Sequence, residues 1–169
     1  VFYLLTFVSI PTLALYGAVR GPNFIVGHGP DAPVMLGAVL EMIVALAGIG
    51  TAVTLYPVVK RQNEQFALGF VTSRTLEAAT IYAGIVSLLS IVTLRQAGAG
   101  AAALIPGQAL AAQYAWAFFF GQGFLAAINA VLLGSLLYRS RLVPRWLPTL
   151  GFIGAVLLLA SWIATMLGL

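Results

Sequence analysis

Five long apolar runs constrain this sequence more than any other feature. Each is long enough to cross the hydrocarbon core of a bilayer, for which an α-helix needs roughly 20 residues. A single span in lipid can satisfy its backbone polar groups only as a helix. The sequence therefore predicts an all-α integral membrane helical bundle that forms one domain over residues 1–169. We expect five transmembrane helices, at approximately 1–19, 34–59, 66–94, 109–138 and 147–169.

The composition excludes a water-soluble globular protein. Hydrophobic residues make up 62% of the chain and charged residues only 7%, whereas a soluble domain is about 25% charged. The lipid bilayer is therefore the first partner that we predict. The chain also has no Cys and a single His, which leaves no disulfide, thiolate or zinc–sulfur chemistry. We predict no metal site and no cofactor.

The basic residues cluster in two of the four predicted connections. Five lie in loops 60–65 and 139–146, and two lie in loops 20–33 and 95–108. Because cytoplasmic loops carry an excess of Lys and Arg, we expect the first pair of loops to be cytoplasmic and the second pair extracytoplasmic. The membrane would be the bacterial cytoplasmic membrane. No arginine-rich groove with interleaved aromatic residues is present, so we predict no binding to nucleic acid.

The two ends of the sequence suggest a longer protein. The chain opens at Val1 inside an apolar run, without the charged start of a signal peptide, so we expect the natural N-terminus to lie upstream. The fifth predicted helix would end on the outside. A protein with both termini in the cytoplasm would need another span beyond Leu169, and we therefore expect six helices in the full-length protein.

Five charged or amide residues inside the predicted spans are the candidates for a functional role. Arg74 and Glu77 lie three residues apart in the third span, and Asn129 of the fourth span falls at a similar depth to Glu77. Glu41 of the second span and Gln122 of the fourth lie at a common level in the outer half. A charge in a bilayer costs about 2.5 kcal/mol or more, so these groups should face the interior of the bundle. We take them as the candidate intramembrane polar site.

The helical spacing allows a packing interpretation of one group. Arg74 and Glu77 stand at i and i+3, so they can satisfy each other within one helix, and Asn129 can bridge to them from the next. These groups could therefore fix the register of the helices, or they could bind a substrate, an ion or a proton. The sequence leaves both open.

Glu41 has a different setting, because no basic residue lies at its depth. It shares a helix face with Gly37, Ala45 and Gly48, small residues that allow helices to approach closely. We expect Glu41 either to form a hydrogen bond with Gln122 or to take part in a proton-binding step.

Aromatic residues near the ends of the predicted spans are typical of anchors at the headgroup level. Those that we assign to this role are Tyr16, Tyr56, Tyr138, Trp116 and Trp146.

Three stretches carry a resemblance to a known family. They are Leu55–Glu64, Ser73–Ala78 and Tyr138–Leu147, which combine a basic turn, an intramembrane Arg–Glu pair and a basic loop. Together they resemble the bacterial multi-pass membrane family catalogued as the domain of unknown function DUF4386, and the resemblance covers most of the chain. It implies a bundle of about six spans, five of them in this sequence. It implies no reaction.

Two function classes compete. The first is a small transporter or sensor that handles a proton, an ion or a small molecule at the polar site. The alternative is a structural or accessory subunit, in which the charges are packing elements and the apolar outer faces meet a protein partner in the membrane. An enzyme acting on lipid is the weakest candidate, since the sequence has no nucleophile elbow, zinc-protease motif or phosphate-binding loop. We predict no catalytic residue.

Overall fold

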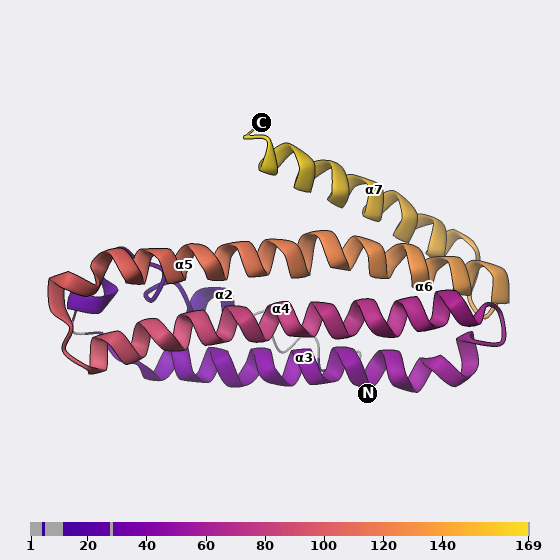
Figure 1. Cartoon of the computed structure of the whole chain (residues 1–169). Coiled ribbons are helices and arrows are strands. Elements are labelled where there is room, and N and C mark those ends of the chain that lie inside the picture. Colours follow the sequence, from indigo (N-terminus) through magenta and orange to yellow (C-terminus); the bar gives the residue numbers. More distant parts are fainter. Residues whose placement is uncertain (1–4, 6–11, 28, 169) are drawn as a thin grey trace. The chain divides into compact units, whose positions relative to one another are not determined.

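The computed structural model describes residues 5, 12–27 and 29–168, and every regular element among them is helical (Figure 1). The predicted all-α fold class is confirmed. In chain order the helices are α2 (Thr12–Leu15), η2 (Phe24–Val26), α3 (Ala32–Val59), α4 (Glu64–Gln96), η3 (Gly100–Ala103), α5 (Leu104–Phe118), η4 (Phe119–Leu125), α6 (Ala126–Ser140) and α7 (Trp146–Met166). The elements η2 and η3 are 3₁₀ helices, and η4 is a π-helical segment.

Four helical stretches of the described residues are long and apolar enough to cross a membrane, one fewer than predicted. Their bounds are Ala32–Val59, Glu64–Gln96, Gly100–Ser140 and Trp146–Met166. They correspond to the second to fifth predicted spans. Much of the first predicted span, 1–19, lies outside the described residues. Helices α3 and α7 carry apolar side chains of their own on every face, which is typical of helices embedded in lipid.

The predicted connection 95–108 is mostly helical, and its true turn covers only 97–99. Gly98 ends α4 with a left-handed φ of +66°. Its N–H donates to the carbonyl of Arg95 at 3.0 Å, and the N–H of Ala99 donates to the carbonyl of Leu94 at 3.3 Å. This pair of bonds is the Schellman motif, which satisfies carbonyl groups at the end of a helix.

The chain divides into two compact units. Unit one comprises residues 1–47 and 79–118, and unit two comprises residues 48–78 and 119–169. Both α3 and α4 contribute to each unit. The single domain that we expect from the sequence stays a prediction.

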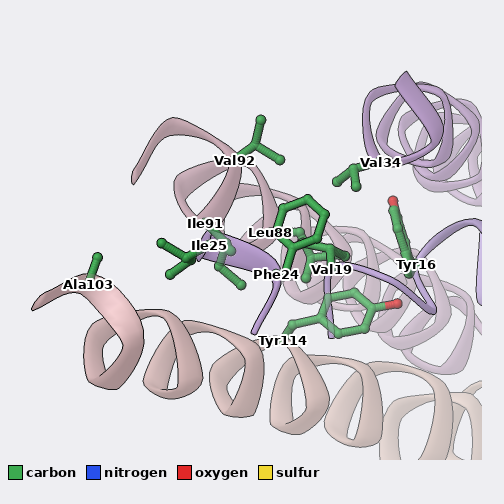
Figure 2. Packing of buried hydrophobic residues seen from close by; sticks show 10 residues of the cluster. All are labelled: Tyr16, Val19, Phe24, Ile25, Val34, Leu88, Ile91, Val92, Ala103 and Tyr114. Atoms are coloured by element: carbon green, nitrogen blue, oxygen red, sulfur yellow. The ribbon is translucent and has the colours of Figure 1, made fainter. Parts of the chain in front are cut away.

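Unit one has an aromatic and aliphatic core (Figure 2). Its buried members come from the segment after α2, from η2 and η3, and from α3, α4 and α5. They are Tyr16, Val19, Phe24, Ile25, Val34, Leu88, Ile91, Val92, Ala103 and Tyr114. The rings of Tyr16 and Tyr114 meet edge to face, with their centroids 5.5 Å apart. This core places two phenol groups in the interior of unit one.

Unit two is held by contacts among α6, η4 and α7. Trp162 of α7 stacks on Phe119, with ring centroids 5.6 Å apart, and also contacts the ring of Phe124. Gly134 of α6 leaves room for the ring of Phe152, since a Cβ atom at this position would lie 2.9 Å from Phe152 Cε1. A smaller cluster of Val59, Ala67 and Leu136 joins α3, α4 and α6.

Candidate functional site

Glu41 lies in the core of unit one, on α3, and is only 5% exposed. Its two carboxylate oxygens have different partners. The Tyr16 hydroxyl donates to Oε2 at 3.3 Å, and the Tyr114 hydroxyl donates to Oε1 at 3.3 Å. Neither ion pair found among the described residues includes Glu41. The buried carboxyl is therefore held by two phenols rather than by a cation.

Two glycines make room for these phenols. Gly37 lies one helical turn before Glu41, and a Cβ atom at this position would lie 2.5 Å from Tyr16 Cε1. A Cβ atom on Gly84 of α4 would lie 3.1 Å from Tyr114 Cδ2. The small-residue face that includes Gly37 thus permits a close approach, as expected, but the group that approaches is an aromatic ring.

The assignment of Tyr16 as a headgroup anchor is wrong, because its side chain is fully buried. We did not predict Tyr114 as a partner of Glu41. The available signals were a carboxyl without a cation and a glycine one turn away, which indicate that a bulky polar group could reach the site. A positive charge lies near Tyr114, because the guanidinium of Arg20 is 6.0 Å from the centroid of its ring.

A second polar cluster lies in unit two. Arg74 Nη1 donates to Glu77 Oε2 at 2.5 Å, so the pairing expected from their spacing on α4 is present. Asn129 of α6 donates through Nδ2 to the same oxygen at 2.5 Å, which joins α4 to α6. Gly48 of α3 lies beside the guanidinium, since a Cβ atom at this position would lie 3.6 Å from Arg74 Nη2. Its missing side chain leaves room for the arginine.

Three buried polar atoms, two of this cluster and one of the neighbouring residue Ser73, have no hydrogen-bond partner. They are Ser73 Oγ, Arg74 Nε and Asn129 Oδ1. Most buried polar groups in proteins form a hydrogen bond, so each of these atoms calls for an explanation. Because they include both donors and an acceptor, they suit a water molecule or a small polar ligand.

The structure therefore divides the five predicted site residues between the two units. Glu41 belongs to unit one. Arg74, Glu77 and Asn129 are brought together in unit two, and Gln122 of η4 belongs to that unit as well. The predicted hydrogen bond between Glu41 and Gln122 stays a prediction. Within the searched part of the chain, no group of three His, Cys, Asp or Glu residues could hold a metal ion.

Comparison with known proteins gives a family without an assigned activity. The chain matches the family described as "Domain of unknown function (DUF4386)" over residues 1–168. No curated protein and no solved structure matches the chain.

Proposed function

The chain belongs to the DUF4386 family, whose description assigns no reaction, and we propose from its polar sites that it is a small proton-linked membrane transporter or sensor. Glu41 is the proposed proton-binding group. The observation that carries this proposal is a buried carboxyl in a candidate membrane-spanning helix, with two phenol partners and no ion pair to any described residue. The proposed location is the bacterial cytoplasmic membrane.

The phenols can accommodate both protonation states of Glu41. A hydroxyl group donates one hydrogen bond and can also accept, whereas a carboxylate only accepts. The charged form can accept from both tyrosines. The protonated form can donate to one hydroxyl and accept from the other. A proton can therefore be taken up or released at Glu41 without breaking an ion pair.

Glu77 is a poorer candidate for the proton-binding step. Protonation of Glu77 would remove the charge that pairs with Arg74 and would leave a partly buried guanidinium without its counter-ion. Breaking a fully buried pair in this way costs about 3–5 kcal/mol, and a partly buried pair costs less. The Arg74–Glu77–Asn129 cluster therefore suits a permanent polar contact between α4 and α6. The unpartnered Nε of Arg74 and Oδ1 of Asn129 suit a hydrogen bond to water or to a small polar substrate.

Infrared difference spectroscopy can test the proton-binding role without knowledge of a substrate. Spectra of the protein in lipid, recorded between acid and neutral pH, should contain the carbonyl band of a protonated buried carboxyl. We expect Glu41→Gln to remove this band and Glu77→Gln, the matched change in the other unit, to retain it. A band that survives Glu41→Gln contradicts the proposal.

Proton flux in proteoliposomes distinguishes a transporter from a sensor. A transporter would dissipate an imposed pH gradient, read with an internal pH-sensitive dye, and Glu41→Gln would abolish this flux. A sensor would show the infrared band without flux.

The second candidate, a structural or accessory subunit, is favoured by the paired charges of Arg74 and Glu77 and by α7, most of which is exposed. In this view the polar cluster fixes the helix packing, and α7 meets a partner helix. Purification from native membranes in mild detergent tests it. A protein that always migrates alone would remove this candidate.

A further inference from the structure

The connection between α6 and α7 is an ordered loop with a concave surface. Residues 141–145 line a shallow, open depression of about 540 Å³. The chain reverses at Arg141, whose φ of +55° lies in the left-handed region. The N–H of Leu142 donates to Ser140 Oγ at 3.3 Å, and the N–H of Leu147 donates to the carbonyl of Pro144 at 3.0 Å. We call residues 139–147 the arginine loop.

Three arginines of this loop carry charge that the described residues do not neutralise. The two ion pairs found in that part of the chain involve Arg74 and Arg95, so none includes Arg139, Arg141 or Arg145. Two of the three are positioned by aromatic rings. The Arg139 guanidinium lies 5.8 Å from the centroid of Phe66, and that of Arg145 lies 5.0 Å from the centroid of Tyr138. Such stacking orients the guanidinium and leaves its N–H groups available for an anion.

The start of α7 adds to the positive field. Its N-cap position is Arg145, which forms no side-chain cap, and its first turn contains no acidic residue. The dipole at a helix N-terminus favours an anion. In the first turn of α7 the N–H of Leu147 already donates to Pro144 and Pro148 has no N–H, so this 21-residue helix contributes mainly its dipole.

Exposed apolar side chains flank the same charges. Leu142 is 59% exposed and Trp146 is 63% exposed, and Leu147 is exposed as well. A free phosphate ion would gain nothing from these side chains. A phospholipid would use both features, because its phosphate can meet the guanidinium groups while its glycerol and acyl portions meet Trp146 and Leu142.

We propose that the arginine loop is a binding site for the headgroup of an anionic phospholipid in the adjacent leaflet. The arginine side chains bind the phosphate, and Trp146 lies at the headgroup level. This site is separate from Glu41 and does not depend on the proposed proton-linked function.

Quenching of Trp146 fluorescence by brominated lipids tests the proposal. The chain has three Trp residues, so the Trp116→Phe and Trp162→Phe changes leave Trp146 as the sole reporter. In vesicles that contain both headgroups, we expect brominated phosphatidylglycerol to quench Trp146 more strongly than brominated phosphatidylcholine does. Arg141→Gln with Arg145→Gln should lower this preference at least about tenfold, because the loss of even one hydrogen bond to a charged phosphate costs about 1.5 kcal/mol or more, and about 1.4 kcal/mol corresponds to a factor of ten.

Lys60→Gln with Arg61→Gln is the matched control. It removes the same charge from the other basic connection of unit two, where both side chains are also exposed, and we expect it to change the preference less than twofold. An equal loss in both double variants would show a general charge effect and would overturn the proposal. Loss of the preference when inorganic phosphate is added at constant ionic strength would also overturn the proposal, because it would assign the site to a free ion.

A conservative pair keeps the test valid if the neutral variant does not fold. Arg141→Lys with Arg145→Lys retains the charge but removes the forked geometry that binds phosphate through two hydrogen bonds. We expect a loss of about two- to threefold with the fold intact. An unchanged preference in this folded variant would contradict a site in which the forked guanidinium groups bind the phosphate.

Discussion

Gly37 and Gly84 show how residues without side chains shape the site of Glu41 and its two tyrosines. The rings of Tyr16 and Tyr114 occupy space that any side chain on Gly37 or Gly84 would need. Because a hydrogen bond to a charged group contributes about 1.5–3 kcal/mol, moving either ring changes the energy of the buried carboxylate. The glycines are therefore part of the Glu41 site although they donate no hydrogen bond to it.

Gly37→Ala should destabilise unit one. The new methyl group would lie within 2.8 Å of Tyr16 Cζ, so the ring must move from a fully buried position. We expect a loss of about 1–3 kcal/mol, the usual cost of an overpacked core, and a lower midpoint of thermal unfolding in detergent.

The control for this change is Gly154→Ala on α7, where no atom lies within 4 Å of the added methyl group. Its stability should be unchanged or slightly higher, because Ala favours a helix by up to about 1 kcal/mol over Gly. Equal midpoints for the two variants would show that Gly37 does not make room for Tyr16.

The contacts that sequence could predict at this scale are those that helical geometry determines. Arg74 and Glu77 lie on one helix face because of their i, i+3 spacing, so their pairing follows from the sequence alone. The contacts of Glu41 join residues 25 and 73 positions apart. Such pairs depend on which helices pack together, and neither depth nor periodicity supplies that information.

At the scale of whole elements, the second to fifth predicted spans agree with the observed helices except at one boundary. The stretch 95–108 is rich in Ala and Gly and contains Pro106 and Gly107, so the sequence predicts a connection there with room for a short interfacial helix. Proline is tolerated in the first turn of a helix, where its missing N–H has no partner to bind, and Pro106 lies there in α5. Only Gly98 and Gly100 of this stretch have positive φ.

Gly98→Ala should therefore weaken the end of α4. An L-residue in the left-handed region costs about 1–2 kcal/mol, and Gly98 has a φ of +66°. The expected result is a lower thermal midpoint and faster proteolysis at the 97–99 turn. Gly151→Ala is the control, since this glycine lies inside α7 with open space around it. Equal proteolysis of both variants would contradict the role of Gly98 in the Schellman motif.

At the scale of the whole molecule, composition predicts the class of protein but not its division into units. Low charge and long apolar runs require helices in lipid, and this inference does not depend on which helices pack together. The division assigns Glu41 to unit one and Glu77 to unit two, and the two carboxyls have different partners. Because hydropathy is similar along all the spans, it carries no signal for this division.

The orientation of the chain in the membrane gives the last prediction. If the four candidate spans each cross once, residues 60–63 and 141–145 must lie on one side and residues 97–99 on the other. The positive excess places the first two connections in the cytoplasm. The chain has no Cys, so a cysteine introduced at Gln62, Leu142 or Ala97, all exposed, would be the sole target of a membrane-impermeant maleimide. In intact cells we expect labelling at position 97 alone, with positions 62 and 142 labelled only after the membrane is permeabilised. Labelling of 62 and 142 from opposite sides would mean that the helical stretch Gly100–Ser140 or α4 does not cross the bilayer, because two single crossings must return the chain to the side from which it started.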